Sequence, residues 1–96
     1  VMGHPEIAAA ILRPYVRPEV HDAIRVHQDF QGKHYYGHFG GNVNARDKYE
    51  GEDFFDLAAL FADEWDQIAF DPDAETYPLE HFEPLVREVF ATPKYL

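Results

Sequence analysis

Cysteine is absent from this chain of 96 residues. Its absence excludes disulfide bonds and thiolate metal sites, so a metal ligand here has to be a histidine or a carboxylate. The absence also fits the reducing conditions of the cytoplasm. The sequence shows no positively charged apolar leader of the kind that directs export. We therefore expect a cytoplasmic protein.

Positive charge is scarce, because eight Lys and Arg residues stand against eighteen Asp and Glu residues, which gives a formal net charge of −10. A field of this sign repels phosphate backbones and anionic membranes, so neither nucleic acid nor a membrane is expected as a partner. The apolar runs are also too interrupted by charge to span a bilayer. A small anionic substrate is still compatible with this negative charge, because a bound divalent metal can dominate the local field.

Material for a hydrophobic core is plentiful, with 46% hydrophobic and 16% aromatic residues. This composition is too apolar for a disordered segment. The length fits one small domain, which buries only about 60–65% of its extended surface and has little stability to spare. Additional exposed apolar surface on such a domain would need a partner.

The hydrophobic pattern predicts an all-α fold, because apolar residues recur at intervals of three and four and no strand-like alternation appears. Helices are expected at residues 5–16, from residue 18 to just beyond His27, at 53–67 and at 79–90. The first should end near residues 13–16, where Pro14 interrupts its hydrogen bonds. The predicted core is formed by Ile7, Ile11, Val20, Ile24, Phe54, Leu57, Phe61, Trp65, Phe82, Leu85 and Val89.

Residues 31–51 are predicted to form one long loop, since they hold five of the six glycines. Loops of this length in compact domains are usually functional or mobile. The segment also concentrates several of the chain's few cations, from which a pocket for an anion could be built. The alternative is an ordinary packed loop, in which tyrosines cover the core and basic residues face water. Both alternatives involve the same basic, histidine and tyrosine side chains of this segment, which are Lys33, His34, Tyr35, Tyr36, His38, Arg46 and Lys48.

Two histidines are candidate metal ligands. His4 and His27 lie 23 residues apart, a separation that lets two antiparallel helices bring both imidazoles together. Histidine with Asp or Glu suits iron, manganese, zinc or similar ions. The alternative is that His4 is an exposed terminal residue and His27 a hydrogen-bonded core histidine, because no tight HxxxH or HxH pair is present.

An acidic cluster, Asp63-Glu64-Trp65-Asp66, ends the third predicted helix. Asp63 and Asp66 are three residues apart, so they share a helical face and could both point at a metal or a substrate. A carboxylate on the inner side of an apolar helix needs a cation or hydrogen-bond donors. The alternative is a solvated helix end, although negative charge there opposes the helix dipole.

Three stretches of the sequence carry a resemblance to a known superfamily: HPEIAAAIL from His4, the pair Val26-His27, and Trp65-Asp66-Gln67 followed by LEHFEPL from Leu79. In order and spacing they resemble the later part of predicted HD phosphohydrolases, and of the neighbouring mixed-valent di-iron oxygenases that cleave phosphonates or inositol. The resemblance implies an HD-domain-like helical bundle. Residues 1–96 would be the C-terminal portion of a single HD-type domain whose N-terminal part is missing.

The resemblance also assigns ligands. Members of the superfamily use an early His, an adjacent His-Asp pair, two later histidines and a closing Asp. By similarity, His4 and His27 correspond to the two later histidines and Asp66 to the closing aspartate, with Asp63 as a competitor. Lys33 resembles a substrate-contacting lysine of the oxygenases, although it lies two residues later, and His34 and Tyr35 would adjoin it.

The opening half of the ligand set is absent, because the only His-Asp dipeptide, His21-Asp22, lies between the two candidate histidines and is out of order. We therefore expect this chain to be part of a longer protein, to hold an incomplete metal site and to be inactive alone. No catalytic residue beyond the ligands is assigned.

Three functions are consistent with the sequence. In the first, the intact protein is a metal-dependent phosphohydrolase in which metal-activated water attacks a small phosphorylated substrate. In the second, a di-iron centre activates dioxygen to oxidise an organophosphonate or polyol. In the third, the chain is a non-catalytic helical interaction module. An apolar face left bare by the absent part would also favour a homo-oligomer.

Overall fold

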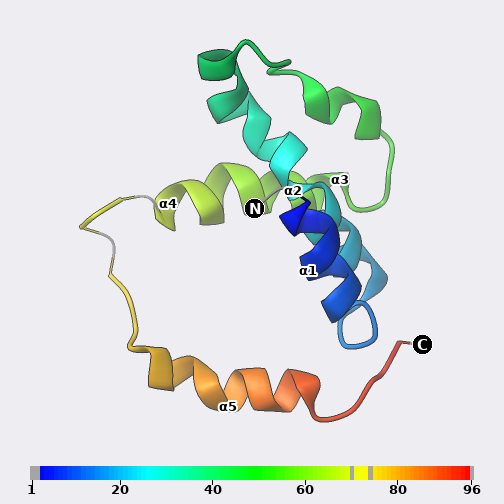
Figure 1. The fold of residues 1–96 in the computed structure, drawn as a ribbon, viewed down its shortest axis with the longest axis vertical. Coiled ribbons are helices and arrows are strands. Elements are labelled where there is room, and N and C mark those ends of the chain that lie inside the picture. Colours follow the sequence, from blue (N-terminus) through cyan, green and yellow to red (C-terminus); the bar gives the residue numbers. More distant parts are fainter. Residues whose placement is uncertain (1–2, 70, 74, 96) are drawn as a thin grey trace.

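The computed structural model describes residues 3–69, 71–73 and 75–95, and all regular structure within these ranges is helical (Figure 1). The predicted all-α class is confirmed. None of the helices described combines the length and apolar character needed to cross a bilayer. The α-helices are α1 (His4–Leu12), α2 (Pro18–Tyr35), α3 (Phe55–Leu60), α4 (Gln67–Ala69) and α5 (Leu79–Phe90), with 3₁₀ turns η1 (Tyr36–Phe39) and η2 (Ala45–Tyr49) and a π-helical segment η3 (Phe61–Asp66).

A tight turn folds α1 back along α2. Helix α1 ends at Leu12, just before the predicted end, because Pro14 cannot continue its hydrogen bonds. The amides of Tyr15 and Val16 both donate to the Leu12 carbonyl, and Pro18 opens α2. The two helices run side by side in opposite directions (Figure 1). This arrangement brings the first residue of α1 beside the middle of α2.

Helix α2 is longer than the sequence indicated. It continues through Tyr35, so the prediction of a loop beginning at residue 31 was wrong for residues 31–35. The reason is packing at Gly32: a Cβ there would lie 2.5 Å from Cδ2 of Tyr36, so only glycine lets that ring fold back on the helix. A glycine inside a helix costs about 1 kcal/mol relative to alanine, which is why the sequence pattern favoured a loop here.

The predicted helix at 53–67 is present as a continuous run of α3, η3 and α4 from Phe55 to Ala69. Its middle is π-helical, with hydrogen bonds from each residue to the fifth along the chain. A π-helical turn is wider than an α-turn and occurs often at functional sites. The π-helical segment carries both candidate aspartates, Asp63 and Asp66.

The core is smaller than predicted, and alanines make half of it. It lies between α2 and the α3–η3 run and consists of Ala23, Val26, Phe30, Phe54, Ala58 and Ala62. Among the eleven predicted core residues only Phe54 is buried. Val20, Ile24, Leu57, Phe61 and Val89 are half-buried, and Ile7, Ile11, Trp65, Phe82 and Leu85 are exposed. The helices approach each other along their alanines, so much of each broad apolar stripe faces away from the contact.

Helix α5 has the predicted bounds but stands apart from the other helices (Figure 1). None of its residues is buried. Its C-terminal end is tied to the α1–α2 turn, where the amides of Lys94 and Tyr95 donate to the Pro14 carbonyl at 2.7 and 2.9 Å. The rings of Tyr15 and Phe90 meet edge to face at 4.7 Å.

These burials predict that core and surface substitutions differ in how much they lower the free energy of unfolding. Phe30→Ala should lower the free energy of unfolding by about 3–5 kcal/mol, because it empties a site that is 0% exposed. Ile7→Ala, at a position that is 54% exposed, should cost less than about 1 kcal/mol. Urea unfolding followed by circular dichroism measures both. A similar loss in the two variants would contradict this assignment of the core.

Candidate metal centre

The two candidate histidines meet. Nε2 of His4 lies 3.3 Å from Nε2 of His27, and their ring centroids are 5.2 Å apart. The predicted approach of these imidazoles is therefore confirmed. His4 is the first residue of α1, and His27 lies midway along α2, so the α1–α2 turn is what joins them.

Helix α2 itself orients the His27 ring. Its Nδ1 lies 2.6 Å from the carbonyl oxygen of Ile24. A carbonyl only accepts, so Nδ1 donates this hydrogen bond and Nε2 is the ring nitrogen that faces His4. The ring of Phe61 stands edge-on to His27 at 6.0 Å. Metal-binding histidines are typically held by such a second hydrogen bond from the other ring nitrogen.

No third ligand joins the pair among the residues that the structure describes, where no group of three or more His, Asp or Glu side chains could hold an ion. The candidate set His4, His27, Asp63 and Asp66 is thus gathered only in part. The two aspartates do share a face, as predicted, because both contact α2: Asp66 accepts a hydrogen bond from Gln31, and Asp63 lies 2.8 Å from Nε2 of His34.

Asp63 is paired with a buried cation. Arg46 donates from both terminal nitrogens to the Asp63 carboxylate, at 2.8 and 2.9 Å, and also donates to the Phe30 carbonyl. The guanidinium further stacks over the Phe30 ring at 5.0 Å. These hydrogen bonds hold the pKa of Asp63 well below its ordinary value, although burial opposes them and the bond with His34 adds to them. Asp63 is therefore a charged anchor between η2, α2 and η3.

The three predicted substrate-binding residues lie at the C-terminal end of α2. Lys33 is exposed, and its charge contributes to lowering the pKa of Asp63. His34 is held by Asp63, and the Tyr35 hydroxyl accepts a hydrogen bond from Gln67 at 3.0 Å. Only Lys33 of the three presents an exposed side chain.

A second anchor was missed at the level of sequence. The Asp29 carboxylate receives hydrogen bonds from the hydroxyls of Tyr36 and Tyr49, at 3.2 and 3.0 Å, and an ion pair from Lys48 at 3.2 Å. Burial and the negative charge of Asp29 raise the pKa of both tyrosines. These contacts fasten both ends of the segment at 36–49 to α2, while most of the residues between them are exposed.

The sequence held a partial signal for these anchors. A carboxylate on an inward helical face requires a cation, and Arg46 and Lys48 are among the few cations available. Which aspartate each one binds depends on the path of residues 36–49. No periodicity encodes that path.

Comparisons of the chain with protein-family models, with curated proteins and with solved structures gave no match.

The Arg46–Asp63 pair predicts an acid-sensitive contribution to stability. At pH 7, Asp63→Asn should cost about 1–3 kcal/mol, a value reduced from that of a fully buried pair because Asp63 is partly exposed. Since the folded-state pKa is depressed, this contribution is present above the ordinary carboxyl pKa of about 3.9 and is lost as pH falls toward the lower folded value. Unfolding curves from pH 7 to pH 3 should therefore show the gap between wild type and variant narrowing.

Glu83→Gln is the matched control, because Glu83 pairs with Arg87 across four residues on the exposed surface of α5. It should change the free energy of unfolding by less than about 0.5 kcal/mol at any pH. A gap for Asp63→Asn that stays constant down to pH 3 would show that Asp63 is not a depressed carboxylate.

Proposed function

We propose that this chain carries part of an HD-type metal-dependent phosphohydrolase that acts on a small phosphorylated substrate, with His4 and His27 as two nitrogen ligands of a divalent metal. The observation that carries the proposal is the 3.3 Å separation of their Nε2 atoms. Two nitrogens bound at 2.0–2.1 Å to one tetrahedral ion lie roughly 3.3–3.4 Å apart.

The orientation of His27 supports the same proposal. Its Nδ1–H donates to the Ile24 carbonyl, so its Nε2 points toward His4 and toward the place where an ion would sit. The separation of the two Nε2 atoms is also within hydrogen-bond range, so an ion would replace a direct contact between the rings. A divalent cation held between these nitrogens would supply Lewis-acid activation of water and neutralisation of phosphate charge.

Asp66 is the better candidate for the carboxylate ligand. It contacts Gln31, which follows His27 by four residues and so lies one turn, about 6 Å, along the same face of α2. Asp63 contacts His34, a further turn away, and its charge is already balanced by Arg46. Both the geometry and the resemblance favour Asp66 over Asp63.

Phosphate recognition needs a local reversal of the overall charge of −10. Lys33 supplies one cation from the C-terminal end of α2, where its charge contributes to lowering the pKa of Asp63. We assign it to contact with the substrate phosphate, while His34 and Tyr35, each held by a partner, shape the neighbouring surface. The metal would provide the remaining positive charge.

Metal titration tests the ligands. The chain should bind Zn²⁺ or Co²⁺ in calorimetry at pH 7.5, and His4→Ala and His27→Ala should each weaken binding by about 100-fold or more. His38→Ala is the control, since His38 is exposed on η1, outside the helices that carry the pair. Equal binding by all three variants and the wild type would remove the pair from the metal site.

The two aspartates are compared in the same assay. Asp66→Asn should weaken metal retention by roughly 10–100-fold, whereas Asp63→Asn should leave it within about threefold. Loss of metal only in the Asp63 variant would reverse the assignment.

Phosphate binding tests the substrate class. The Zn²⁺-loaded chain should bind inorganic phosphate, and Lys33→Ala should weaken that binding by roughly five- to tenfold, the worth of one exposed charge contact. The metal-free chain should not bind phosphate measurably, because its net charge repels the anion. Equal phosphate binding with and without metal would contradict the proposed role of the metal.

A further inference from the structure

The folded chain exposes more surface than a compact monomer of the same mass. Its accessible area is 7170 Å² for 11.1 kDa, whereas a compact monomer of that mass exposes roughly 5,700 Å². The radius of gyration is 14.8 Å, against about 12.5 Å for a compact domain of this length. The excess, roughly 1,500 Å², is more than the about 800 Å² per partner that a standard stable interface buries.

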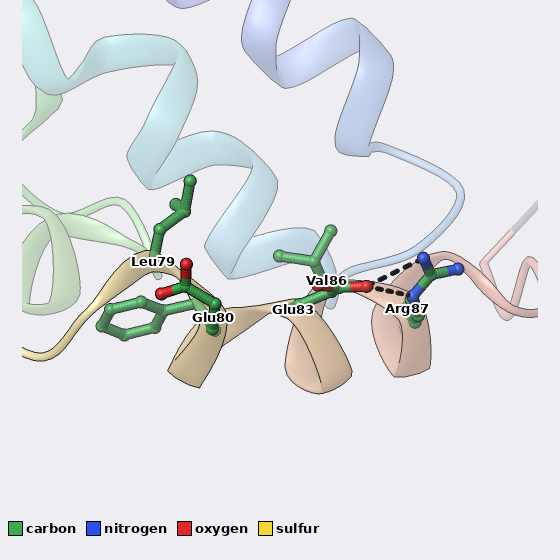
Figure 2. Close-up of a pocket in the computed structure, with 6 residues that line it drawn as sticks. Leu79, Glu80, Glu83, Val86 and Arg87 are labelled. Atoms are coloured by element: carbon green, nitrogen blue, oxygen red, sulfur yellow. Dashed lines mark hydrogen bonds and ion pairs between the residues drawn. The ribbon is translucent and has the colours of Figure 1, made fainter.

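One part of the excess is the apolar face of α5. Phe82, Leu85 and Val86 are between 42% and 52% exposed although they form the apolar stripe of this helix. Figure 2 shows Leu79 and Val86 projecting from the same side of α5, with the Glu83–Arg87 ion pair beside them. The stripe borders open grooves of about 420 and 320 Å³. Leu12, Val16 and Tyr15 of the same chain border this face but leave it largely open, so helix α5 is a ridge that its own chain covers only in part.

The other part is a hollow between α2 and the α3–η3 run. It has a volume of about 290 Å³ and an almost wholly apolar lining. Trp65, 54% exposed, stands at its edge. The side chains that give the hollow its apolar character are Val20, Ile24, Leu57, Phe61 and Trp65.

We propose that the ridge and the hollow form an interface between two copies of this chain, with α5 of each copy lying against the hollow of the other. Both halves of the contact are present on one chain, so a twofold axis pairs them twice and closes the assembly. The excess surface is sufficient for such a dimer.

Local charge at the two surfaces supports a second copy as the occupant. Arg17 borders the hollow, while α5 carries three glutamates, Glu80, Glu83 and Glu88, against one arginine. Within one chain α5 cannot cover the hollow as it stands, because the Pro14 tie and the Tyr15–Phe90 contact hold its far end at the α1–α2 turn. The net charge of −10 on each copy opposes the contact at long range, so the apolar surfaces have to supply its affinity, and the same charge opposes an anionic membrane as the partner.

Light scattering and sedimentation test the dimer. The wild-type chain should be a dimer at micromolar concentration, and Leu85→Lys and Trp65→Lys should each raise the dissociation constant by about 100-fold or more, since each buries a charge in the interface. Both positions are more than half exposed in the single chain, so helical content by circular dichroism should be unchanged. Val43→Lys is the control, because Val43 is also exposed but lies between η1 and η2.

Crosslinking identifies which surfaces meet. Because the chain has no native cysteine, only the introduced thiols can form disulfides. Leu85→Cys and Trp65→Cys are made as single variants, distinguished by mass, mixed and oxidised. The proposal predicts that the mixed disulfide dominates over either homodimer. A monomeric wild-type chain overturns the proposal, and so does a dimer that survives both Lys substitutions or gives no excess of the mixed disulfide.

Discussion

One ion pair, between the buried Arg46 and the partly exposed Asp63, holds three segments of the structure together. Arg46 is 9% exposed, and its guanidinium binds the Asp63 carboxylate, the Phe30 carbonyl and the Phe30 ring. It therefore joins η2, α2 and η3 at the edge of the core. An inward carboxylate in a chain this acidic would be costly without a cation. The pair holds η3 against α2 at Asp63, while Asp66 makes its own contact with α2 through Gln31.

These contacts link the anchor to the candidate metal site. Along one face of α2, His27, Gln31 and His34 follow at intervals of four and three residues, and η3 runs beside them with Asp66 on Gln31 and Asp63 on His34. His34 and Arg46 together hold Asp63, whereas Asp66 contacts Gln31, one turn closer to His27 along the same face.

The alanine contacts of the core explain why so much apolar surface stays outside. Ala23, Ala58 and Ala62 let α2 and the α3–η3 run approach closely, but they fill little volume. The larger side chains on either side of this line of contact, Trp65 among them, then face a hollow that α5 does not reach. A small domain gains most of its stability from burial, so surface of this kind favours association.

The sequence alone determined the helical class, the bounds of α5 and the meeting of His4 with His27, because periodicity, proline positions and a short turn are local properties. It did not determine the continuation of α2 to Tyr35, the small core or the partner of Asp63. Those depend on contacts between distant segments: the Tyr36 ring on Gly32, alanine faces that bring helices together, and a cation delivered by residues 36–49. Helical periodicity shows which side of a helix is apolar, but only packing decides how much of that side a neighbouring helix covers.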